Sequence, residues 1–112
     1  MQINHEVKNG VGVVRVVGPL TSATVDEFRR VLWQWYPQAG CKHVVLDLSG
    51  MESLDSTGLG TLIGALKLVG EKGGDIKIAS LQKRPRLVFE ITRSYKVFEI
   101  FDTVAEALAA AK

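Results

Sequence analysis

The fold is decided by one stretch of the chain, Val44-Val45-Leu46-Asp47-Leu48-Ser49-Gly50-Met51-Glu52-Ser53-Leu54-Asp55-Ser56-Thr57-Gly58-Leu59-Gly60. Its first five residues are mostly aliphatic and alternate little with polar ones, which is typical of a strand covered on both faces. Its last part places N-cap residues ahead of apolar positions at helical spacing, which predicts a helix over residues 56–72 that Gly73-Gly74 ends. The side chains expected on its core side are Leu59, Leu62, Ile63, Leu66 and Val69.

The sequence before this stretch predicts a hairpin and then a helix. Residues 3–8 and 11–17 flank Asn9-Gly10, a dipeptide that tolerates the positive φ angles of a tight turn, and Gly18-Pro19 ends the second strand. Thr24 and Glu27 have the spacing of a capping box that opens the helix, which Pro37 terminates. Its expected apolar stripe is Val25, Phe28, Leu32, Trp35 and Tyr36, with the ring of Trp33 along the flank.

The sequence after the stretch predicts two more strands and two more helices. The strands are residues 76–79 and 97–101. A helix over residues 85–92, with Pro85 in its first turn, is expected to turn Leu87, Val88 and Ile91 inward. Thr103 and Glu106 form a second capping box, which opens a C-terminal helix. The element order is ββαβαβαβα, an α/β fold with a mixed sheet and helices packed against it.

Length and composition exclude several classes of protein. The chain has 112 residues, which predicts a single domain over residues 1–112, with a monomer as the default state. A net charge of +2 is too small to indicate nucleic-acid binding, and one cysteine, Cys41, excludes an internal disulfide and a multi-cysteine metal site. The N-terminus is not a secretory signal, and no apolar stretch is long enough to insert in a membrane. We therefore expect a cytoplasmic protein.

The start of the central helix departs from what folding alone requires. Gly58, Gly60 and Gly64 each cost up to about 1 kcal/mol in a helix relative to alanine. Glycine allows the helix to pack closely on the sheet, and it also leaves the surface beside the hydroxyls of Ser56 and Thr57 free of side chains. Capping of the helix by Asp55, Ser56 or Thr57 is a sufficient reason for these residue types, but it is compatible with an outward-facing Ser56.

Three chemical roles are conceivable for Ser56. A catalytic serine needs a neighbouring base, and His43 is expected at the opposite end of its strand. A dinucleotide site needs its first glycine at the strand exit, whereas Gly58 follows Leu48 by ten residues. A phosphoryl acceptor fits best, because a helix N-terminus favours negative charge. The cluster of Lys83, Arg84 and Arg86 suits an anion or an acidic partner, but a solvated basic face is the expected role there.

Nearly the whole chain closely resembles the STAS domain of bacterial anti-sigma-factor antagonists. The resemblance is carried by Val44-Val45-Leu46-Asp47-Leu48, Leu54-Asp55-Ser56-Thr57-Gly58-Leu59-Gly60-Thr61-Leu62 and Gly73-Gly74-Asp75-Ile76. The stretch Gly18-Pro19-Leu20-Thr21 departs from the family, whose members often carry acidic residues there.

The resemblance implies partner switching without catalysis by this chain. In that family the unmodified domain binds an anti-sigma factor that is also a serine kinase, which releases a sigma factor. Phosphorylation of the serine at the position of Ser56, with Thr57 as the alternative acceptor, ends binding, and a metal-dependent serine phosphatase resets the switch. The chain would need no cofactor or metal of its own. We expect the partner to contact Thr21, Asp55, Ser56, Thr57, Gly58, Leu59 and Gly60.

The alternative function is that of a non-catalytic STAS scaffold subunit in a transport, secretion-regulating or sensory assembly. In that case the serine region is a contact surface and not a switch.

Overall fold

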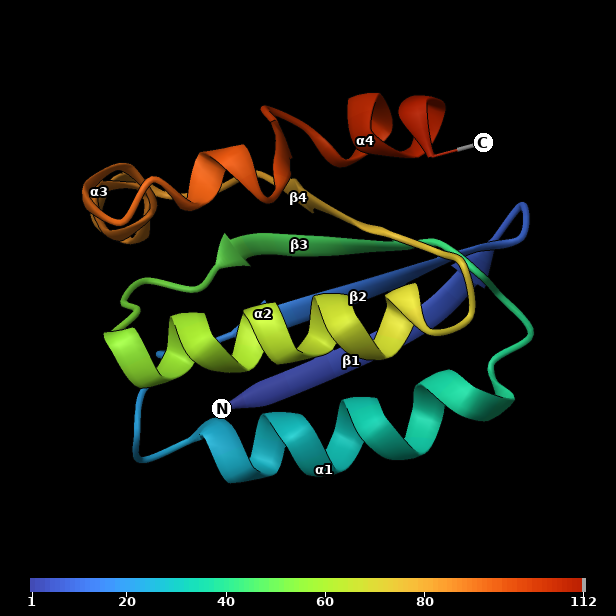
Figure 1. The fold of residues 1–112 in the computed structure, drawn as a ribbon, viewed down its shortest axis with the longest axis horizontal. Coiled ribbons are helices and arrows are strands. Elements are labelled where there is room, and N and C mark those ends of the chain that lie inside the picture. Colours follow the sequence, from blue (N-terminus) through green and yellow to red (C-terminus); the bar gives the residue numbers. More distant parts are fainter. Residues whose placement is uncertain (112) are drawn as a thin grey trace.

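A computed structural model describes residues 1–111 and contains a five-stranded sheet in the order β1-β2-β3-β4-β5 (Figure 1). The first pair, β1 (Gln2–Lys8) and β2 (Val11–Val17), is antiparallel. From β2 onward the strands are parallel, through β3 (Val44–Gly50), β4 (Ile76–Ala79) and β5 (Glu99–Phe101). The predicted element order and the mixed sheet are confirmed. The last strand is shorter than predicted, because residues Ser94–Lys96 form a 3-10 turn, η2.

The turn between β1 and β2 forms as its sequence requires. Asn9 and Gly10 have φ angles of 52° and 80°, the left-handed conformation that both central residues of a tight hairpin adopt. Gly18, at φ 106°, then turns the chain out of the sheet. Because this turn holds β1 antiparallel to β2, β2 lies inside the sheet, where it pairs on its other side with β3.

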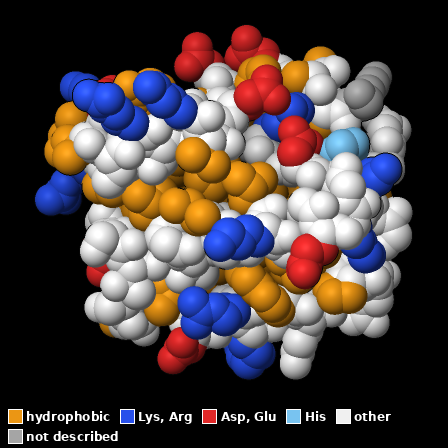
Figure 2. Space-filling model, in the orientation of Figure 1, with side chains coloured by type: hydrophobic (Ala, Val, Ile, Leu, Met, Phe, Trp, Pro, Cys, Tyr) orange, Lys and Arg blue, Asp and Glu red, His pale blue; other side chains and the backbone are white. Residues whose placement is uncertain are grey.

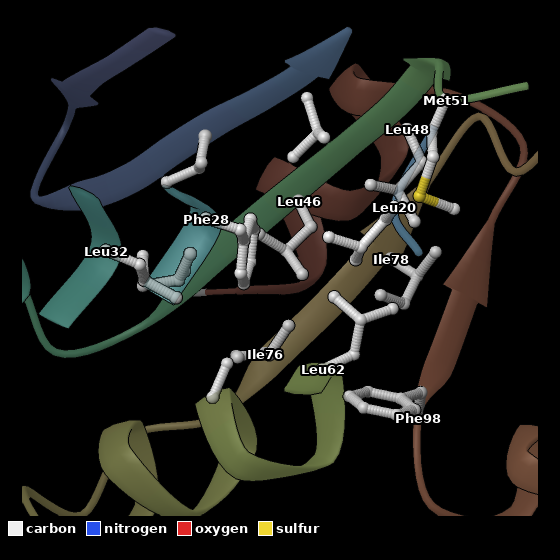
Figure 3. Close-up of a cluster of buried hydrophobic side chains, with 14 of the residues drawn as sticks. Leu20, Phe28, Leu32, Leu46, Leu48, Met51, Leu62, Ile76, Ile78 and Phe98 are labelled. Atoms are coloured by element: carbon white, nitrogen blue, oxygen red, sulfur yellow. The ribbon is translucent and has the colours of Figure 1, made fainter. Parts of the chain in front are cut away.

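One face of the sheet is covered by α1 (Val25–Trp35), which continues into the 3-10 turn η1 (Tyr36–Gln38), and by α2 (Ser56–Gly70) (Figure 1). The predicted stripe of α1 is confirmed, with Trp35 half-buried and the others buried. On α2, Ile63 and Leu66 are half-buried, whereas Thr61 and Ala65 join the core. Figure 3 shows Leu20, Leu48 and Met51 gathered at the carboxyl end of β3, so the core reaches the loop before α2.

The opposite face is covered by α4 (Val104–Ala110), which begins at the predicted cap. The hydroxyl of Thr103 accepts a hydrogen bond from the N–H of Glu106 at 3.1 Å. A small apolar cluster lies beneath this helix, made of Val11, Val45, Ala79, Ala107 and Ala111. Within residues 1–111, no helix combines the length and the apolar character that crossing a bilayer requires.

The prediction for the inward face of α3 (Lys83–Ile91) is wrong for Leu87 and Ile91, whereas Val88 does pack against the main core. Leu87 and Ile91 are 56% and 81% exposed, and Val88 is half-buried. Pro85 and Phe89 face the core instead, and the ring of Phe89 packs against Phe98 with 5.8 Å between centroids. This helix has apolar side chains on two sides, so spacing alone does not show which side the core covers.

The prediction of a capping box at α1 is also wrong in its chemistry. Thr24 occupies the N-cap position, but its side chain makes no cap hydrogen bond. Its hydroxyl accepts the N–H of Thr21 at 3.0 Å and donates to the carbonyl of Pro19 at 2.9 Å. The Thr24 hydroxyl therefore stabilises the loop before the helix, because the Thr21 and Pro19 backbone groups bind it in place of the helix N–H groups.

The two apolar faces of α3 should respond differently to truncation. We expect Phe89→Ala to lower the free energy of unfolding by about 3–5 kcal/mol, because it leaves a cavity in the core. Ile91 is exposed on the same helix, so Ile91→Ala should change the free energy of unfolding by no more than about 0.5 kcal/mol. Urea denaturation of both variants measures the difference, and equal losses would place Ile91 in the core as first predicted.

Candidate functional site

The candidate site is the exposed start of α2, at the end of the molecule where the β2–α1 and β3–α2 loops lie (Figure 1). Ser56 and Thr57 are the first two residues of the helix, and both are exposed. Neither is buried beneath the loops, so the Ser56 hydroxyl is open to another protein. The sequence-based expectation of an accessible hydroxyl agrees with this placement.

Asp55 holds this helix start in place with both oxygens of its carboxylate. Oδ1 accepts the N–H of Gly58 at 2.8 Å, so Asp55 is the cap of α2 among the three residues that the sequence offered. Oδ2 accepts the N–H of Ser22 at 3.0 Å, a residue of the β2–α1 loop. The hydrogen bonds from Gly58 and Ser22 hold the pKa of the Asp55 carboxyl below its ordinary value of 3.8. The carboxylate is therefore ionised at neutral pH and joins two segments distant in sequence.

The β2–α1 loop is joined to the site by its backbone as well. Leu20 forms a parallel bridge with Leu54, and its N–H donates to the carbonyl of Ser53 at 3.0 Å. Thr21 is half-buried in this loop, where its N–H donates to the Thr24 hydroxyl. The structure thus brings Thr21 into the same group of loops as Asp55 and Ser56. The sequence reasoning missed Ser22, since a backbone N–H partner leaves no signal in residue type.

Of the four glycines of α2, the three that the sequence analysis singled out have different surroundings. A Cβ at Gly58 would lie 2.1 Å from the carbonyl oxygen of Leu20. This glycine therefore allows the helix to approach the β2–α1 loop, whereas the sequence predicted a close approach to the sheet. A Cβ at Gly60 would meet no atom within 4 Å. A Cβ at Gly64 would lie 3.7 Å from the ring of Trp33. Gly60 therefore leaves open surface on α2, Gly64 lies beside the ring of Trp33, and Gly58 is needed for packing.

A shallow hollow of about 480 Å³ runs along α2 from Gly64 onward. Its walls include Trp33 of α1 and Gly64, Lys67 and Leu68 of α2. Trp33 is half-buried and packs against the main core, which confirms the expectation that its ring lies along the flank of α1. The surface that begins at Ser56 thus continues toward this ring.

Both histidines are engaged away from the start of α2. Nδ1 of His43, just before β3, lies 2.8 Å from a carboxylate oxygen of Asp75, just before β4. His5 of β1 stacks on Trp35, with 4.9 Å between ring centroids. Within residues 1–111, no group of three or more histidine, cysteine, aspartate or glutamate side chains could hold a metal ion. The start of α2 presents the exposed hydroxyls of Ser56 and Thr57 beside the β2–α1 loop.

The chain belongs to the STAS domain family, whose sequence profile matches residues 2–107. It is 31% identical over 108 residues to the anti-sigma F factor antagonist of Paenibacillus polymyxa, covering 96% of this chain and 92% of that protein. The crystal structure of an anti-sigma factor antagonist from Mycobacterium paratuberculosis superposes with a TM-score of 0.87 at 25% identity, over 98% of this chain and 92% of that one.

The same fold occurs in the Bacillus cell fate determinant SpoIIAA, solved in its phosphorylated form. That structure gives a TM-score of 0.74 at 19% identity and covers 99% of this chain and all of that one. At this identity the likeness concerns the fold alone.

The close approach at Gly58 gives a direct test of the packing at the site. We expect Gly58→Ala to lower the free energy of unfolding by at least about 2 kcal/mol, because its methyl group would overlap the carbonyl of Leu20. The matched control is Gly60→Ala, which should raise stability by up to about 1 kcal/mol, since alanine is the better helix former in open space. Thermal or urea unfolding checks both signs, and a neutral Gly58→Ala would contradict the close approach.

The Asp55 carboxylate should make stability depend on pH in a defined direction. Because its pKa is lower in the folded chain, its contribution is present above pH about 4 and is lost as pH falls through the folded pKa. The difference in unfolding free energy between the wild type and Asp55→Asn should therefore be largest near neutral pH and shrink on acidification. Urea titrations across pH measure it.

A matched control for this test is Glu52→Gln, which removes the same charge from an exposed residue of the same loop. It should change the unfolding free energy by no more than about 0.5 kcal/mol. A difference for Asp55→Asn that does not vary with pH would contradict the role given to the carboxylate.

Proposed function

We propose that this protein is an anti-sigma-factor antagonist that works by partner switching. In this proposal the unmodified start of α2 binds an anti-sigma factor that is also a serine kinase, and phosphorylation of Ser56 ends the complex. A metal-dependent serine phosphatase restores the unmodified form. The observation that carries the proposal is the exposed Ser56 hydroxyl, which lies on a surface that is ordered in the chain by itself.

The chain supplies the surface and the acceptor, and the kinase supplies ATP. Ser56, Thr57 and Gly60 are exposed and form the part of the predicted set that a partner can touch. Gly58 and Leu59 are buried, so they support this surface from beneath. Thr21 stands at its margin, in the loop that Asp55 holds. Asp55 would position Ser56 through the backbone, because both of its oxygens already accept N–H groups.

The start of α2 is able to carry a phosphoryl group without refolding. The positive end of the helix dipole favours negative charge there, and the exposed position leaves the phosphate in water. A partner that covers Ser56 would have to bury a dianion beside the Asp55 carboxylate. Burial of an unpaired charge costs several kcal/mol, whereas a hundredfold loss of affinity needs about 2.7 kcal/mol. One phosphoryl group is therefore sufficient to release the partner.

The proposal predicts opposite effects of two substitutions at Ser56. Ser56→Ala should bind the cognate kinase with unchanged affinity and should not be released by ATP, whereas Ser56→Asp should bind at least about tenfold more weakly. Calorimetric titration with the kinase, repeated after incubation with ATP, measures both effects. Thr57→Ala is the matched control and should be released by ATP like the wild type.

Other results would contradict the proposal in distinct ways. Release of Ser56→Ala together with retention of Thr57→Ala would move the acceptor to Thr57. A scaffold subunit of a larger assembly, by contrast, would bind its partner equally through Ser56→Ala and Ser56→Asp, and mass spectrometry of protein from growing cells would find no phosphate on Ser56.

A further inference from the structure

The segment formed by α3 and η2 carries a net charge of +4, which exceeds the net charge of +2 of the whole chain. Residues 83–97 contain five basic side chains and one acidic side chain, of the fourteen basic and twelve acidic ones in the whole sequence. The rest of the chain is therefore slightly acidic. Figure 2 shows Lys and Arg side chains (blue) gathered over α3. The basic residues of the segment are Lys83, Arg84, Arg86, Arg93 and Lys96.

The same segment holds four of the five large apolar side chains that are exposed within residues 1–111. Leu87 and Ile91 lie one helical turn apart on α3, at 56% and 81% exposure, and Tyr95 and Val97 follow at 49% and 53%. The fifth, Val7, lies on β1. Leu87 and Ile91 share one side of the helix, and exposed apolar side chains that share a surface within a polar rim are typical of a binding surface, whereas scattered ones are not.

The apolar surface of α3 continues toward α2. Val88 lies beside Leu87 and Ile91 and is half-buried, as are Ile63 and Leu66 of α2, and all three half-buried side chains pack against the main core. Figure 2 shows hydrophobic side chains (orange) in the strip between α3 and α2, next to the basic side chains. We use the name α3 patch for the surface made of Lys83, Arg84, Leu87, Val88, Ile91 and Arg93.

The charges of the α3 patch do not serve the helix itself. Lys83 and Arg84 lie in the first turn of α3, where the helix dipole disfavours positive charge, and the N-cap residue Gln82 makes no side-chain cap. Within residues 1–111, neither basic side chain takes part in an ion pair, whereas Arg86 donates to the carbonyl of Leu81 at 3.1 Å. A positive charge that opposes the helix dipole and forms no ion pair within the chain is available to bind another molecule.

We propose that the α3 patch is a second docking surface, which binds an acidic amphipathic helix of a partner protein. The partner's apolar side chains would pack on Leu87, Val88 and Ile91, and its carboxylates would face Lys83, Arg84 and Arg93. A helix laid on an apolar strip with charged margins is a common mode of protein recognition. The proposal does not depend on the Ser56 switch, since it uses other residues.

Charge and shape favour this occupant over three others. A second copy would bring the same basic side chains to a symmetric interface, where they repel. A nucleic acid would leave the apolar centre without a partner. A membrane offers anionic charge, but a flat surface reaches the half-buried side chains between α3 and α2 less well than the ridge of a helix does.

The test is a titration of the full chain, labelled with ¹⁵N, with a short synthetic helical peptide. The peptide carries leucines at positions i, i+4 and i+7, with glutamates on both sides of that stripe. We expect amide shifts confined to α3 and the facing part of α2, and an affinity that falls as salt is added. Leu87→Ser with Ile91→Ser should weaken binding at least about tenfold, and Arg84→Glu at least about threefold.

Matched controls come from β1. Val7→Ser removes an exposed apolar side chain, and Lys8→Glu reverses an exposed charge, both away from the patch, so both should leave the affinity unchanged. Ser56→Asp should also bind the peptide like the wild type, which separates failure here from failure of the switch.

Four results would overturn the proposal. They are shifts centred on another face, equal binding of a peptide with lysines in place of the glutamates, absence of binding, and a preference for phosphatidylcholine vesicles containing phosphatidylglycerol over the peptide.

Discussion

The geometry of the candidate site depends on the two hydrogen bonds that the Asp55 carboxylate accepts. One comes from Gly58 within α2 and the other from Ser22 in the β2–α1 loop, so a single side chain fixes the helix start and the neighbouring loop together. The close approach of Leu20 to Gly58 makes the same connection through packing. Neither contact uses the Ser56 hydroxyl. The residue proposed to be modified is therefore held in place by its neighbours and remains free itself.

Most of the fold could be predicted because its signals are local. Asn9-Gly10 required a tight turn, the residues of β3 up to Leu48 are mostly aliphatic, and Thr103 with Glu106 marked a helix start. The start of α2 was equally predictable, since Asp55 is a strong cap ahead of an apolar pattern. Each of these features follows from a few adjacent residues, and the structure contains each of them.

The errors arose where two partners compete for one residue. The hydroxyl of Thr24 could have capped α1, but the loop groups of Thr21 and Pro19 take it. The helix α3 could have buried Leu87 and Ile91, but Phe89 fits against Phe98 and decides the orientation. The spacing of apolar residues within one helix does not show which of its sides faces the core. The role of Gly58 was missed for the same reason, because the carbonyl it accommodates belongs to a distant loop.

The thin cover on the second face of the sheet has a consequence for the dynamics of the fold. In α4 and its C-cap only Ala107 and Ala111 are fully buried, with Val104 and Leu108 half-buried, whereas α1 and α2 bury large side chains on the other face. Because methyl groups remove little apolar area from water, the C-terminal helix should open at a lower free energy than the rest of the domain. Such opening would uncover Val11 and Val45 while the proposed Ser56 surface, on the far side of the sheet, stays folded.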